Sequence, residues 1–148
     1  MREGFILGNR ILDIVVVSLV VAQTLKVLFY LFKEKKLNFR KYLDTGSMPS
    51  SHSASVSSLA TAVGISEGVE SVFFAISIIF AVVVMYDATG VRRAVGKQAV
   101  VLNKMIDNIR KKENAILFEE NLKELIGHTP LEVLAGALLG VAIAFVMS

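Results

Sequence analysis

The chain has 148 residues, of which 54% are apolar and only 20% are charged, and its formal net charge is +3. This length allows one domain, 1–148, and the composition is more apolar than that of an average soluble domain. The chain has no cysteine and two histidines, which excludes disulfides and thiolate metal sites and disfavours a multi-histidine cage. We therefore expect no metal and no cofactor.

The first apolar run extends from Ile11 to Phe32, about 22 residues, which suffices to cross a bilayer. It contains three polar residues, Asp13, Gln23 and Lys26. Gln23 and Lys26 lie three residues apart and share a helix face, which we expect to look into protein or water. A lysine inside a spanning helix is costly and usually functional, although its long side chain can also reach the interface. The pattern gives Asp13 no role.

The next two segments differ in character. Segment Ser50–Ile65 is short, only moderately apolar and rich in serine and alanine, which predicts a helix packed among other helices because small residues permit close backbone approach. Segment Val69–Met85 is the most lipid-like run of the chain and predicts a membrane-spanning helix.

The last two segments complete the predicted fold. Segment Val91–Lys112 has helical spacing of its apolar residues and predicts an amphipathic helix, interfacial or docked under the bundle. Segment Leu131–Met147 is barely long enough to span, and its Gly136–Gly140 pattern of small residues fits either a homo-oligomer or tight packing within the bundle. We predict an all-α integral membrane helical bundle with about four membrane helices plus one amphipathic cytoplasmic or interfacial helix.

The basic residues predict the topology. Thirteen of the 16 Lys and Arg residues lie in two stretches, 33–41 and 92–123. If Ser50–Ile65 crosses the membrane, both stretches share one side, which should be the cytoplasm, and both termini face outward. If Ser50–Ile65 is instead re-entrant, the two stretches fall on opposite sides, which the charge bias disfavours. Because these basic residues flank apolar runs, we expect them to set topology rather than to bind nucleic acid.

Three polar motifs should then meet at the cytoplasmic face: Met48–His52, Asp87–Arg93 and Gly127–Glu132. Both histidines of the chain lie in these motifs, each near the start of an apolar helix. A helix N-terminus suits a phosphate group, and serine and arginine side chains add donors. Two histidines offer a nucleophile and a general acid near neutral pH. This combination predicts cleavage of a phosphate monoester or diphosphate without a metal.

These motifs resemble a known family. Pro-Ser-Ser-His at 49–52 resembles the Pro-Ser-Gly-His motif of the type 2 phosphatidic acid phosphatases, relatives of the vanadium haloperoxidases, and His128 with Glu132 resembles their His-x-x-x-Asp. Over nearly the whole chain, the three motifs together resemble the divergent branch of that superfamily, which comprises small bacterial and plastid membrane proteins. The resemblance implies a lipid phosphate phosphatase of a bacterial inner (cytoplasmic) membrane. Its substrate would be phosphatidic acid, phosphatidylglycerol phosphate or a polyprenyl phosphate.

The resemblance also implies roles for individual residues. His128 would attack phosphorus and form a phosphohistidine, Glu132 would hold its imidazole in the correct tautomer, and His52 would protonate the leaving oxygen. The phosphate-binding residues would be Ser50, Ser51, Arg92, Arg93 and Lys26.

The sequence leaves alternatives open. Ser51 replaces the family's glycine, and the family's Arg-Pro and Ser-Arg motifs are not recognisable, so a catalytically silent phospholipid-binding or scaffold protein is the alternative function. A small transporter fits less well, since no internal repeat is evident. Residues 129–132 also fit a capping box with proline at the first helical position, so Glu132 is a cap, a catalytic residue or both. His128 alone would fit a plain interfacial residue, and the two arginines would fit headgroup anchors.

Overall fold

The computed structural model describes residues 4–34, 48–113, 122 and 127–148. Within these residues the chain forms only helices: α1 (Arg10–Glu34), α2 (Ser51–Glu67), α3 (Val72–Thr89), α4 (Val91–Glu113) and α5 (Pro130–Met147). Three helical runs are long and apolar enough to cross a membrane, namely α1, α5 and the run from Val72 to Ile109 that α3 and α4 form together. The predicted all-α membrane bundle is confirmed.

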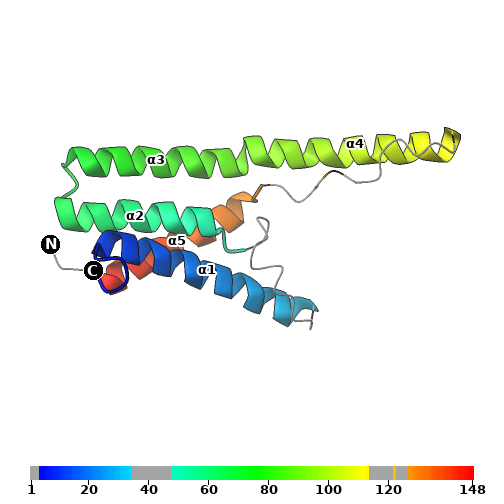
Figure 1. Ribbon diagram of the computed structural model, residues 1–148. Helices are drawn as coiled ribbons and strands as arrows, with labels where there is room; N and C mark the ends of the chain where they lie inside the picture. The colour runs from blue at the N-terminus through cyan, green and yellow to red at the C-terminus, as the bar shows by residue number, and fades with distance from the viewer. Residues whose placement is uncertain (1–3, 35–47, 114–121, 123–126) are drawn as a thin grey trace.

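Helix α2 is the central helix of the bundle. It packs against α1, α3 and α5, and it runs antiparallel to α1 and α3 (Figure 1). Its 17 residues rise about 26 Å, close to the roughly 30 Å of hydrocarbon in a bilayer. Helix α2 therefore runs the length of the bundle, although it is not among the three runs that are long and apolar enough to cross a membrane.

The serines of α2 explain how a polar helix can lie inside the bundle. Ser55 and Ser58 donate their hydroxyl protons to carbonyl oxygens one turn earlier in the same helix, at 2.9 Å in both cases. Ser57 donates both to the carbonyl oxygen of Ala54 in its own helix, at 3.3 Å, and to that of Ala137 on α5, at 3.0 Å. These bonds satisfy the hydroxyl groups without water, and the small side chains let neighbouring helices approach closely.

Two glycines of α5 make the tightest of these contacts. A Cβ atom on Gly136 would overlap the carbonyl oxygen of Ser50, and one on Gly140 would overlap that of Ala54. Since Ala54 belongs to α2 and Ser50 is its N-cap, the pattern of small residues serves packing within the bundle. A homo-oligomer remains a prediction, and the Gly136–Gly140 pattern does not support it, because that pattern is used within the bundle.

The three polar motifs gather at one end of the bundle. Both chain termini lie at the opposite end (Figure 1). The backbone N–H of Ser50 donates to the carbonyl oxygen of Glu132, and that of His128 donates to Ala88, each at 3.0 Å. These bonds tie the starts of α2 and α5 and the end of α3 together. Of the predicted basic stretch 33–41, residues 35–41 lie outside the described residues, as does Lys123 of the second stretch.

Helix α4 prolongs α3 beyond the bundle instead of folding back beneath it (Figure 1). Among the described helices it contacts only α3. The Asn103 amide bonds both the N–H and the carbonyl oxygen of Leu122, each at 2.9 Å. This pair of bonds anchors Leu122 to the projecting helix. The helix itself was predicted, but its direction was not.

The end of the bundle that carries the termini is closed by hydrogen bonds to backbone. The buried carboxylate of Asp13 accepts the N–H groups of Ile6 and Leu7, at 2.9 and 2.8 Å. The Arg10 guanidinium donates to the carbonyl oxygens of Met147 and Ser148 at the end of α5. Arginine at that position satisfies carbonyl groups that a helix C-terminus leaves without partners.

Candidate functional site

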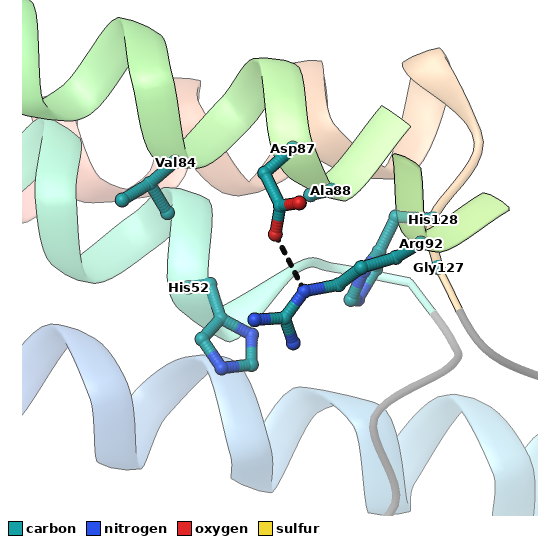
Figure 2. A pocket seen from close by; sticks show the side chains of 7 residues that line it. All are labelled: His52, Val84, Asp87, Ala88, Arg92, Gly127 and His128. Carbon is teal, nitrogen blue, oxygen red and sulfur yellow. Dashed lines mark hydrogen bonds and ion pairs between the residues drawn. The ribbon is translucent and has the colours of Figure 1, made fainter. Parts of the chain in front are cut away.

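A pocket lies where the three motifs meet (Figure 2). Its walls come from the first turn of α2, the last turns of α3, the first turn of α4 and the loop before α5. The lining residues are His52, Val84, Asp87, Ala88, Arg92, Gly127 and His128. The pocket therefore joins segments that are up to 76 positions apart in the sequence, and it holds three of the eight predicted site residues.

Both histidines of the chain face this pocket. Their ring centroids are 6.3 Å apart and the rings are inclined by 75°. A nucleophile attacks from roughly 3–3.5 Å, and a general acid donates its proton over about 2.6–3.2 Å. The two rings are thus near enough to contact one phosphoryl group bound in the pocket that both histidines line. His52 is exposed on α2, whereas His128 is only 3% exposed.

Gly127 brings His128 to this position. Its φ of +94° is a conformation that side chains disfavour, and a Cβ atom here would overlap the backbone of Arg93. The loop therefore lies directly against the start of α4, which allows the His128 N–H to bond Ala88 on α3. The sequence analysis placed Gly127 in a motif but gave it no role.

Three buried side-chain atoms of the described residues have no hydrogen-bond partner, Ser18 Oγ, Gln23 Oε1 and His128 Nε2, and of these residues only His128 lines the pocket. Its Nε2 is buried and has no hydrogen-bond partner among the described residues. A buried polar atom without a partner is unfavourable by about 1–3 kcal/mol, and such atoms are rare enough to require an explanation. A ligand bound in the pocket that His128 lines would supply the partner that Nε2 lacks.

Burial lowers the pKa of His128 below its ordinary value. The Lys26 ammonium lowers this pKa further, while the Glu132 carboxylate acts in the opposite direction, and His52 and Arg92 add smaller lowering effects. The neutral imidazole is therefore favoured at neutral pH. This is the protonation state that a nucleophilic histidine requires.

Lys26 lies behind the pocket wall rather than in it. Its side chain is 1% exposed, and its Nζ donates to the Ser51 hydroxyl at 3.2 Å. Because the ammonium is buried in the bundle, the alternative that it reaches the membrane interface is wrong. The prediction that its helix face looks into protein is confirmed, and Lys26 and Ser51 stand together beside the two histidines.

Ser50 and Arg93 lie outside the pocket lining. Ser50 is fully buried and caps α2, where its hydroxyl oxygen accepts the Ser53 N–H at 3.3 Å and the Ser53 hydroxyl at 3.0 Å. Arg93 contributes backbone that contacts Gly127, and its side chain is exposed. Of the two adjacent arginines, Arg92 is the one whose side chain lines the pocket.

Glu132 forms the predicted capping box. Its carboxylate accepts the Thr129 N–H at 2.9 Å, and its own N–H donates to the Thr129 hydroxyl at 3.3 Å. Among the described residues, no hydrogen bond joins Glu132 to His128, although its charge acts on the pKa of that histidine. The cap is confirmed, while the orienting role of Glu132 remains a prediction.

Asp87 is the charged pocket residue to which the sequence analysis gave no role. Its carboxylate lies 2.6 Å from Nε of Arg92 in an ion pair that bridges the junction of α3 and α4 (Figure 2). The signal available in the sequence was an acidic residue at the end of an otherwise apolar helix, five positions before the first arginine.

Comparisons with known proteins show what the chain is similar to. A family model described as "Divergent PAP2 family" matches residues 7–143. A relative from Bacillus subtilis (strain 168) is described as "Uncharacterized membrane protein YuiD". It is 40% identical in an alignment of 140 positions that covers 88% of this chain and 89% of that protein. No solved structure matches the chain. Together with the apolar helices, these matches show that the chain is a membrane protein.

Proposed function

Because this chain belongs to the divergent PAP2 family, we propose that it is a metal-independent lipid phosphate phosphatase that works through a phosphohistidine. Candidate substrates are phosphatidic acid, phosphatidylglycerol phosphate and a polyprenyl phosphate. The observation that carries the proposal is the pair of histidine rings across one pocket, 6.3 Å apart, with a buried and unpartnered Nε2 on His128.

The proposed reaction has two steps. His128 Nε2 attacks phosphorus, the bond to the ester oxygen breaks, and protonated His52 gives its proton to that oxygen as the alcohol leaves. Neutral His52 then takes a proton from water, whose oxygen attacks the phosphohistidine and releases inorganic phosphate and free His128. Arg92 and Lys26 supply positive charge to the phosphoryl oxygens in both steps. The pocket lining offers nitrogen donors and a single carboxylate that is already paired with Arg92, so no step needs a metal.

Access from the bilayer supports a lipid substrate. Within the described helices, α1 and α3 do not contact each other, although both pack against α2. The α2 face between them carries His52, Ser55 and Leu59, all of which are exposed or partly exposed. A phosphate headgroup at the two histidines would therefore leave its chain beside Leu59, two turns deeper along α2.

The proposal places the site on the cytoplasmic side of a bacterial inner membrane, with both termini outward. The excess of Lys and Arg in the two stretches at the site end supports this orientation. Because the chain has no cysteine, single cysteines at Lys97 and Glu67, both exposed, can be labelled without background. In intact cells an impermeant thiol reagent should label Glu67→Cys and not Lys97→Cys, and the reverse pattern would place the site outside.

The central experiment measures phosphate release from a panel of lipid phosphates by protein purified in detergent. We expect turnover that survives a chelator, that orthovanadate inhibits as a mimic of five-coordinate phosphorus, and that His128→Ala abolishes. A water-soluble phosphate monoester should be a poor substrate beside a lipid that fills the face between α1 and α3. Loss of turnover in chelator that magnesium restores would defeat the mechanism.

A second candidate function is a phospholipid-binding or scaffold protein without turnover. The observation that favours it is the Glu132 carboxylate, which is occupied by the helix cap and forms no hydrogen bond to His128 in the described part of the chain. In that case the protein would bind a lipid phosphate and orthovanadate, but no phosphate would be released from any member of the panel.

A further inference from the structure

Asp87 is an acidic side chain in a pocket that otherwise suits an anion. It lies in the last turn of α3 and lines the same pocket as His52 and His128. A carboxylate there repels a phosphate group, since like charges at short range disfavour each other. Its presence therefore calls for a role that compensates for this repulsion.

The contact that Asp87 makes indicates that role. Its Oδ2 lies 2.6 Å from Nε of Arg92, a short charge-assisted hydrogen bond. This bond uses the inner nitrogen of the guanidinium. Figure 2 shows the two terminal amino groups of Arg92 turned away from Asp87, on the side of His52. Those groups have the planar fork geometry that recognises phosphoryl oxygens in pairs.

Arg92 needs such an anchor because of where it stands. Its side chain is 52% exposed, so the surrounding protein does not fix its rotamer by packing. A long side chain that must become ordered when a ligand binds weakens the binding, and prior ordering removes that penalty. An ion pair with this exposure contributes little to folding stability. Positioning of the arginine is thus a better account of the pair than stabilisation of the helix junction.

We infer that Asp87 is a positioning residue, which holds Arg92 through Nε so that the terminal amino groups of the guanidinium face a phosphoryl group bound in the pocket beside the two histidines. The inference rests on the proposed phosphate site and adds a residue to it. It makes Asp87 favourable for anion binding through Arg92 even though its own charge is unfavourable.

Because these two effects of Asp87 on anion binding are opposite, the direction in which affinity changes tests the inference. Orthovanadate affinity is measured by calorimetry for the purified parent protein, Asp87→Ala, Arg92→Ala and the double variant. If Asp87 acts by positioning, Asp87→Ala weakens binding roughly tenfold while Arg92 is present. In the Arg92→Ala background the same change leaves the affinity unchanged or improves it, because only the repulsion is removed. A purely electrostatic role predicts tighter binding in both backgrounds, and a purely structural role of the Asp87 side chain predicts the same loss of affinity in both, so either pattern contradicts positioning through Arg92.

Controls separate these effects from folding. Asp87→Asn keeps an acceptor for Nε and should bind orthovanadate more tightly than Asp87→Ala, and it serves as the test variant if Asp87→Ala does not fold. Asp107→Asn changes an exposed acid farther along the α3–α4 rod and should leave the affinity unchanged. Unfolding midpoints of all variants should agree within the spread of repeated measurements.

The outcomes distinguish this inference from the proposed function. Equal or tighter binding by Asp87→Ala in the presence of Arg92 overturns the inference and leaves the phosphatase proposal standing. A parent protein that binds orthovanadate but releases no phosphate defeats the proposed activity, while the sign pattern still supports the role of Asp87. A parent protein that binds no oxyanion overturns both.

Discussion

The two ends of the bundle each bury a polar group, and they treat it differently. At the end that carries the termini, the Asp13 carboxylate is 3% exposed and accepts two backbone N–H groups. At the other end, the His128 imidazole is also 3% exposed, yet its Nε2 has no partner among the described residues. The two side chains are equally buried, but the Asp13 carboxylate has hydrogen-bond partners and the His128 Nε2 has none.

This difference in hydrogen bonding indicates which buried polar group is structural and which can serve a ligand. A buried carboxylate whose oxygen atoms accept backbone donors closes the fold and has nothing left to offer a ligand. A buried nitrogen without a partner lowers stability unless something else binds it, and here it faces a pocket with a second histidine and an arginine. Polar residues inside a membrane bundle are therefore better sorted by their partners than by their burial.

The largest effects should come from removing each of these two polar groups in turn. His128→Gln keeps a polar side chain of similar size but removes the nucleophile, so turnover should fall by at least about a thousandfold, with stability changed by less than about 1 kcal/mol. Asp13→Ala leaves two N–H groups without their acceptor and should lose about 1–3 kcal/mol of stability. Its turnover per folded molecule should match that of the parent. Phosphate release and thermal unfolding in detergent measure both quantities.

The assignment of a catalytic role to His128 and a structural role to Asp13 is contradicted if either variant behaves like the other. Turnover of His128→Gln near the parent level would remove the nucleophile from the proposal. A loss of turnover in Asp13→Ala that persists after correction for the folded fraction would show that the far end of the bundle reaches the site.

Glu132 should give the next largest effect, and it tests whether one residue serves both roles. A glutamine can accept the Thr129 N–H nearly as well as a glutamate, so Glu132→Gln should lose less than about 1 kcal/mol of stability. Orienting a histidine and stabilising its positive charge need the carboxylate, so turnover should fall about a hundredfold. Kinetics at the plateau of the pH profile, beside an unfolding curve, measure the two effects.

Glu132→Asp is the matched variant, because it keeps the charge on a shorter arm. It should retain more turnover than Glu132→Gln. If Glu132→Gln turns over like the parent, Glu132 is a cap only, and the phospholipid-binding alternative gains support.

Much of the fold could be predicted because a bilayer restricts what a chain can do. Long apolar runs must be helices, since backbone groups in lipid need partners within the segment. The serine- and alanine-rich segment Ser50–Ile65 was correctly expected among other helices, and it became α2 at the centre of the bundle. The direction of α4 was not predictable, because an amphipathic pattern gives a helix face and no angle to the preceding helix.

The site could be predicted at the level of motifs but not of individual side chains. Ser50 and Ser51 are adjacent, and only the packing of α1 against α2 decides that Ser51 contacts Lys26 while Ser50 caps a helix. The choice between the two arginines likewise depends on the junction of α3 and α4. Gly127 required the observation that its position contacts the backbone of another helix.

Substitution of one glycine at each end of the bundle should give smaller effects, measured as losses of stability. Gly127 and Gly8 both have positive φ, +94° and +71°. A Cβ atom at Gly8 meets nothing within 4 Å, whereas one at Gly127 overlaps backbone. Gly8→Ala should therefore lose only about 1 kcal/mol of stability for its conformation. Gly127→Ala should lose at least about 2 kcal/mol through added overlap and should displace His128. Equal losses in denaturation would mean that the loop before α5 can relax away from α4.

The smallest predicted effect is a displacement of the acidic limb of the pH profile. Burial is the main cause of the lowered pKa of His128, and the Lys26 ammonium adds to it. Attack requires the neutral imidazole, and a lowered pKa keeps that form populated at more acidic pH. The acidic limb of kcat/KM, which reports the free enzyme, should thus lie below the ordinary histidine value of about 6.5.

Glu132 sharpens this prediction because it acts on the same pKa in the opposite direction. Its carboxylate favours the protonated imidazole and raises the pKa of His128 against the larger effect of burial. Glu132→Gln removes that influence, so the limb of the residual activity should move to still lower pH, while Glu132→Asp should move it less. The direction follows from the sign of the charge alone and does not depend on how far turnover falls. A limb that moves to higher pH in Glu132→Gln would mean that His128 is not the group whose protonation ends activity.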